Sequence, residues 1–157
     1  MPTIQELFAK LVRQGADDLI RHAEATPPDK QTWSPLDKGR TVLDLVQECA
    51  YLNGFAAKTL TERRQPEWSR EQSDRFRMEF DTIEKALARL RAETESLAHA
   101  ILAFPSEHLD DPVQLPWGEN GTLTYWITGP YWNMCYHLGQ VCYIQTLYGD
   151  QGYYYGF

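Results

Sequence analysis

Apolar residues recur with helical spacing in four separate stretches of the chain. The first covers residues 3–25, where Thr3 and Glu6 form a capping-box pattern ahead of apolar side chains that keep the 3.6-residue period. The others run from about 41 to 63, with Thr41 as N-cap, from Ser69 to about 103, and from about 125 or 130 to 148. The pattern predicts an all-α fold, a four-helix bundle.

Two long connections separate these helices. Residues 27–40 join the first helix to the second, and residues 105–124, rich in proline and glycine, join the third to the fourth. Alternation at residues 113–115 allows a short extended piece there, but not a sheet. We expect one domain over residues 1–150, followed by an aromatic tail, 151–157, that packs either on its own chain or across a dimer.

Composition narrows the classes of partner. The chain carries a net charge of −7, which argues against binding to a nucleic-acid backbone, since that requires a basic face. No apolar run approaches the ~18 residues of a membrane span, and the first residues enter an amphipathic pattern instead of a signal region. The 3 cysteines, an odd number without framework spacing, fit reduced thiols. We therefore expect a cytoplasmic protein without nucleic-acid or membrane partners.

The last predicted helix contains the main candidate for chemistry. Residues 132–149 carry no formal charge when histidine is neutral, and apolar groups lie on every side, which is typical of a buried helix. Asn133 and His137 are four residues apart and so share one face of it. Glu48 falls in the middle of the apolar stripe of the second helix, where a carboxylate needs a partner. We expect these three side chains to meet inside the bundle.

Two interpretations of this cluster stay open. In the first, Glu48 and His137 are metal ligands, with Asn133 a weaker third, because imidazole and carboxylate bind zinc, nickel, manganese or iron. Such a site would lower the pKa of a bound water and act as a Lewis acid. In the second, the cluster is a hydrogen-bonded network in which Glu48 accepts from His137, and Asn133 or Gln140 satisfies the remaining groups.

The remaining histidines and cysteines are interpreted as structural or solvated. Asp18 and His22 lie four apart near the end of the first helix, so we expect them to pair locally. We assign no chemistry to two further histidines, taken as solvated, or to the cysteines, taken as small apolar groups: His99, His108, Cys49, Cys135 and Cys142.

The order of these motifs resembles the DinB-like (YfiT-like) superfamily of four-helix bundles over nearly the whole chain. Its most specific piece is Tyr136-His137-Leu138-Gly139-Gln140, which continues to Tyr143-Ile144-Gln145. Supporting pieces are Trp33-Ser34-Pro35, Thr41-Val42-Leu43-Asp44-Leu45-Val46, and Leu109-Asp110-Asp111-Pro112 with Trp117-Gly118. Members of this superfamily typically bind a metal through three histidines, one in the second helix and two, four residues apart, in the fourth.

By position, His137 retains one of these ligands, while Glu48 and Asn133 replace the other two. The resemblance implies a DinB-like protein of unassigned activity, for which a metal-dependent hydrolase or thiol transferase is one hypothesis, with a divalent transition metal between the second and fourth helices. It also implies a homodimer. The alternative hypothesis is a non-catalytic bundle that binds an unidentified small molecule or a like subunit, with an internal Glu–His pair.

Overall fold

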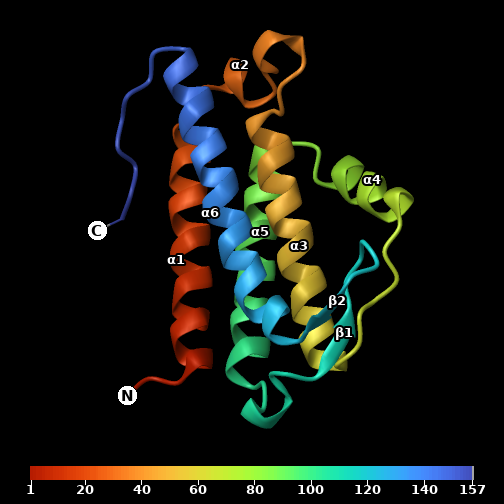
Figure 1. Ribbon diagram of the computed structural model, residues 1–157. Helices are drawn as coiled ribbons and strands as arrows, with labels where there is room; N and C mark the ends of the chain where they lie inside the picture. Colours follow the sequence, from red (N-terminus) through yellow and green to blue (C-terminus); the bar gives the residue numbers. More distant parts are fainter. Residues whose placement is uncertain (157) are drawn as a thin grey trace.

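Four long helices lie side by side in the computed structural model, which describes residues 1–156 (Figure 1). They are α1 (Ile4–Ala25), α3 (Val42–Glu62), α5 (Ile83–Leu102) and α6 (Thr124–Leu147). Both α5 and α6 contact α1 and α3, so the four helices enclose one apolar core. The prediction of an all-α fold is confirmed. None of the helices in these 156 residues is both long enough and apolar enough to cross a membrane.

The predicted N-caps form at the N-terminal ends of the first two long helices. The Thr3 side chain accepts from the backbone N–H of Glu6, and the Glu6 carboxylate accepts from the backbone N–H of Thr3. At the start of α3, the Thr41 side chain accepts from the backbone N–H of Asp44. These bonds satisfy amide groups that have no partner inside a helix. The connection between α1 and α3 contains the short helix α2 (Pro28–Gln31) and a 3₁₀ turn at Pro35–Asp37.

The prediction of one continuous helix from Ser69 to about 103 is wrong. The structure has two helices, α4 (Arg70–Glu79) and α5, with a break at residues 80–82. Thr82 is the N-cap of α5, because its side chain accepts from the backbone N–H of Lys85. The Gln47 side chain donates to the carbonyls of Arg77 and Phe80, so α3 holds the end of α4. No residue of α4 is buried, and the helix lies on the outside of α3 (Figure 1).

The expected extended piece near residue 113 is part of a small sheet, which the sequence pattern does not predict. Strand β1 (Pro112–Gln114) pairs antiparallel with β2 (Asn120–Thr122), in a register that places Pro112 opposite Thr122. Gly118 makes the turn between them with a φ of +91°, a conformation that favours glycine. The sequence pattern does not predict the second strand, because asparagine and glycine are uncommon in strands.

Helix α6 is only partly buried, although its sequence is apolar on every side. It begins at Thr124 and continues through Pro130, and Gly149, with a φ of +92°, follows its end. One face packs in the core through Trp126, Ile127, Met134 and Val141. The opposite face exposes large aromatic side chains, so the expectation of a fully buried helix is wrong.

The C-terminal tail packs on its own chain through residue 156, whereas Phe157 lies outside the described residues. The rings of Tyr154 and Tyr155 lie 5.4 and 4.6 Å from the buried ring of His22. The Gly156 backbone N–H donates to the Asp18 carboxylate at 3.2 Å. Asp18 and His22 pair locally as predicted, but through the backbone of Asp18. His22 Nδ1 contacts the Asp18 backbone carbonyl at 2.9 Å, whereas the Asp18 carboxylate binds the tail.

Candidate functional site

Glu48 of α3 and His137 of α6 meet between the two helices. Glu48 Oε1 lies 2.8 Å from His137 Nε2. The imidazole is buried, with 3% of its side chain exposed, whereas 34% of the Glu48 side chain is exposed. The pair therefore reaches from the core to the surface, and its carboxylate end is accessible to solvent.

Both ring nitrogens of His137 face polar groups. On the side away from Glu48, Nδ1 lies 2.6 Å from Gln140 Oε1. An imidazolium would donate hydrogen bonds from both nitrogens, to Glu48 and to the Gln140 oxygen. A neutral ring would donate to Glu48 only, and Nδ1 would accept from the Gln140 amide group if that amide is rotated by 180°. In either state, Gln140 fixes the orientation of the ring, because it is one helical turn away on the same face of α6.

Asn133 completes the predicted cluster. Its Nδ2 donates to Glu48 Oε1 at 3.5 Å, and its Oδ1 accepts from Cys49 Sγ at 3.5 Å. The three residues singled out in the sequence, Glu48, Asn133 and His137, are thus brought together. The burial of Cys49, followed by the negative charge of Glu48, raises the pKa of the thiol well above its usual range. Cys49 is therefore a neutral hydrogen-bond donor here and not a nucleophile.

Arg40 is a site residue that the sequence reasoning missed. Its Nη1 lies 2.7 Å from Glu48 Oε2, so the guanidinium holds the carboxylate oxygen that His137 does not contact. Arg40 also contacts Asp44, and Arg77 of α4 contacts the same Asp44 carboxylate. The sequence feature that could have indicated this contact is the interval of four residues between Arg40, Asp44 and Glu48, which places them on one side of a helix. No such spacing indicates Arg77, because this residue belongs to a separate helix, α4.

The charge of Glu48 is stabilised by its neighbours. The hydrogen bond with His137 is the largest cause that lowers the pKa of Glu48 to about 2, and the positive charge of Arg40 acts in the same direction, while burial opposes both. The carboxylate is therefore ionised throughout the neutral range. It is a fixed negative charge and hydrogen-bond acceptor, not a proton donor at neutral pH.

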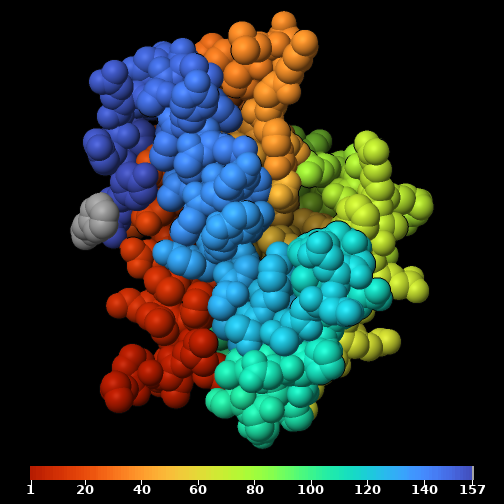
Figure 2. All heavy atoms as spheres, viewed as in Figure 1, coloured from red at the N-terminus to blue at the C-terminus, as the bar shows by residue number. Residues whose placement is uncertain are grey.

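An aromatic pocket of about 400 Å³ opens next to this carboxylate. Phe55 of α3 and Trp126 of α6 line it, together with Trp68 and Trp117, which come from loops and are 50% and 55% exposed. Glu48 is the only acidic residue in the described lining, and Arg77 is its only basic residue. The segments that carry the loop residues project on one side of the bundle, as Figure 2 shows for the hairpin (cyan) and the region of α4 (yellow-green).

The donor set fits a metal ion only in part. Glu48 and His137 are ordinary ligands, and Asn133 is a weak one, but the second oxygen of Glu48 is already paired with Arg40. Within residues 1–156, no group of three His, Cys, Asp or Glu side chains is placed to hold an ion. Protein zinc sites use three or four such ligands. The geometry therefore suits a hydrogen-bonded ionic network better than a tightly held ion.

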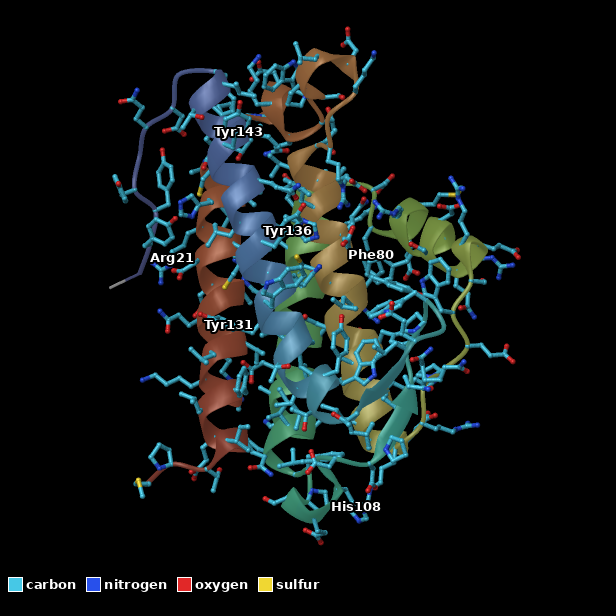
Figure 3. All side chains as sticks on the ribbon, in the orientation of Figure 1. Arg21, Phe80, His108, Tyr131, Tyr136 and Tyr143 are labelled. Atoms are coloured by element: carbon cyan, nitrogen blue, oxygen red, sulfur yellow. The ribbon has the colours of Figure 1, made fainter. Side chains whose placement is uncertain are left out.

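The other residues considered in the sequence lie apart from this cluster. His108 sits in the connection at one end of the bundle, where its Nδ1 is 2.7 Å from Asp111 Oδ2 (Figure 3). His99 and Cys135 are exposed on α5 and α6, and Cys142 Sγ lies 3.6 Å from the Tyr155 hydroxyl. A comparison of the chain with protein-family models and with curated proteins finds no match.

Proposed function

We propose that this chain is a DinB-like four-helix bundle protein that binds a small organic molecule in the pocket beside Glu48. The observation that carries the proposal is the position of an ionised, accessible carboxylate at the wall of an aromatic pocket. A volume of about 400 Å³ is within the range of ligand pockets, which are mostly apolar with a few placed polar groups. Exposed tryptophans such as Trp68 and Trp117 are enriched at recognition sites.

The lining defines the ligand that fits. Phe55 and Trp126 favour a flat or apolar body, which stacks on aromatic faces. Glu48 can accept a hydrogen bond from an amine, amide or hydroxyl of the ligand, and Arg77 can donate to an oxygen. The proposed ligand is therefore a small molecule with an aromatic or aliphatic body and at least one polar group.

A second candidate function is a metal-dependent hydrolase or thiol transferase. The observation that favours it is that a carboxylate oxygen and an imidazole nitrogen, both ordinary metal ligands, face each other from α3 and α6, with Glu48 Oε1 2.8 Å from His137 Nε2. A bound zinc, nickel, manganese or iron ion would supply a Lewis acid at this position. Glu48 and His137 would hold the ion, and Asn133 would orient a ligand beside it.

Binding of the fluorescent dye anilinonaphthalene sulfonate, which has a flat aromatic body and an anionic sulfonate group, tests the first proposal. Leu52 lines the pocket, so Leu52→Trp fills part of it, and the dissociation constant for the dye should rise at least about tenfold. Leu102→Trp is the matched control, since Leu102 is 45% exposed at the end of α5 and does not line the pocket. Equal dye affinity in the two variants would show that the pocket is not the binding site.

Elemental analysis of the purified protein decides between the two candidates. Near-stoichiometric metal that is lost in His137→Ala would favour the metal-dependent enzyme. Protein free of metal, with a melting temperature that a chelator does not change, would favour the binding protein.

A further inference from the structure

Four charged side chains of alternating sign form a row beside the aromatic pocket, which we call the charge row: Glu48, Arg40, Asp44 and Arg77. Arg40 Nη1 lies 2.7 Å from Glu48 Oε2, and Arg40 Nε contacts one oxygen of Asp44. Arg77 Nη1 contacts the other oxygen of Asp44. Helix α3 supplies both carboxylates, and Arg77 comes from α4, which lies on the outside of α3 (Figure 1).

Only the two ends of the charge row line the pocket. Glu48 and Arg77 belong to the lining, whereas Arg40 and Asp44 do not. Each of the two inner side chains has an oppositely charged group on both sides. The pocket wall therefore presents one carboxylate and one guanidinium, each at an end of the row where its charge is not balanced from both sides.

Glu48 keeps room for one more hydrogen-bond donor. A carboxylate accepts about four hydrogen bonds, two at each oxygen. Among the described residues, His137 and Asn133 contact Oε1, and Arg40 contacts Oε2. One acceptor position thus remains on Oε2, and 34% of the Glu48 side chain is exposed.

Arg77 keeps unused donors and an incompletely balanced charge. A guanidinium carries about five N–H donors, and within residues 1–156 Asp44 is the only acidic partner of this one. Burial, followed by the positive charge of Arg40, lowers the pKa of Arg77 below its usual value. The positive charge is therefore less well stabilised than in water, and an anion at the unused N–H groups would stabilise it. The side chain is 31% exposed, so an anion can reach it.

The rest of the lining suits the body of a ligand. The rings of Phe55 and Trp126 lie 5.3 Å apart between their centroids, and those of Tyr51 and Phe55 lie 6.3 Å apart. Trp68 and Trp117 add two further aromatic side chains from the loops. A flat apolar group can pack on such rings while its polar end reaches the two charged groups.

We propose that the pocket binds a zwitterion, whose ammonium group contacts Glu48, whose carboxylate contacts Arg77, and whose apolar body lies among the aromatic rings. This inference rests on the proposed binding function and narrows its ligand to the class of free amino acids and similar molecules that carry both charges. A cation alone would meet Arg77, and an anion alone would meet Glu48, so each singly charged analogue faces one like charge.

Three probes with the same phenyl body test the ligand class by isothermal titration calorimetry. L-Phenylalanine carries both charges, phenethylamine lacks the carboxylate, and hydrocinnamate lacks the ammonium group. L-Phenylalanine should bind at least about tenfold more tightly than either analogue. Equal affinities for the three probes, or no binding of L-phenylalanine at about 10 mM, would overturn the inference.

Two substitutions should remove the two halves of this preference separately. Arg77→Gln should abolish the preference for L-phenylalanine over phenethylamine, and Glu48→Gln should abolish its preference over hydrocinnamate. Arg75→Gln is the control, because Arg75 lies on the same helix, pairs with Glu71 and is 75% exposed outside the lining. This variant should bind all three probes like the wild type. A loss of affinity in Arg75→Gln as large as in Arg77→Gln would also contradict the inference.

The dye experiment distinguishes a failure of this inference from a failure of the proposed function. If the dye responds to Leu52→Trp but the three phenyl probes bind equally, the pocket is retained as a binding site and the zwitterion is rejected. If the dye does not respond to Leu52→Trp, the pocket and the zwitterion are rejected together.

Discussion

Replacement of Glu48 by glutamine removes the charge that joins Arg40 to His137 while keeping the shape of the side chain. In the native protein, Glu48 Oε2 lies 2.7 Å from Arg40 Nη1, and Oε1 lies 2.8 Å from His137 Nε2. Glutamine offers one carbonyl oxygen for these two contacts, and its amide group would face a donor. The substitution therefore leaves a largely buried imidazole or a half-buried guanidinium without its acceptor.

The expected cost follows from the pKa of Glu48. A carboxyl group whose pKa falls to about 2 on folding contributes at most about 3 kcal/mol at neutral pH. A third of the side chain is exposed, so screening by solvent reduces this to about 1–2 kcal/mol. The contribution is complete above the pKa of about 4.3 in the unfolded chain, falls to roughly half by pH 3, and is lost as the pH passes below about 2.

Urea denaturation followed by circular dichroism measures this effect. The free energy of unfolding of Glu48→Gln should be about 1–2 kcal/mol below that of the wild type at pH 7, and the difference should shrink toward pH 3. Glu95→Gln is the control, because Glu95 pairs with Arg13 on the surface and is 53% exposed, so it should cost less than about 1 kcal/mol. Equal losses in the two variants, or a difference that does not change with pH, would refute the reasoning.

Three further predictions concern other parts of the molecule. Gln47→Leu removes the donor to the carbonyls of Arg77 and Phe80, and it should increase the proteolysis rate within α4 while costing about 1–3 kcal/mol in urea denaturation. Tyr155→Ala removes a ring packed on His22 and should lower the free energy of unfolding by about 1–2 kcal/mol. Addition of a chelator to the purified protein should leave the melting temperature unchanged, as measured by calorimetry, if the ionic network is the resident arrangement.

The parts of the fold that depend on local chemistry were predictable. The caps at Thr3 and Thr41 form as expected, because each depends on residues three positions apart. Glu48 and His137 were also recognisable, since each is a polar group on an apolar stripe and each required a partner. Their meeting follows from the packing of α3 against α6.

The parts that depend on long-range contacts were not predictable. The apolar positions at 76, 80 and 83 keep helical spacing, yet Gln47 of a different helix binds the chain at residue 80 and Thr82 begins a new helix. The aromatic pocket has the same origin, because Trp68 and Trp117 come from separate loops that no periodic pattern connects. Likewise, the outward face of α6 cannot be distinguished from its inward face by sequence, because apolar residues lie on every side of the helix.

The exposed helix α4 forms one wall of the aromatic pocket from outside the core. This helix supplies Ser73 and Arg77 to the lining, and none of its residues is fully buried. Gln47 and Asp44 of α3 bind it through polar contacts, and the ring of Phe76 packs edge-on against Tyr51 of α3. Displacement of α4 would break these contacts but would not separate the four long helices from one another. Its amide hydrogens should exchange with deuterated solvent faster than those of the four long helices, and an occupied pocket should slow them. If the pocket binds a ligand as proposed, movement of this one peripheral helix can widen the pocket while the four long helices stay packed.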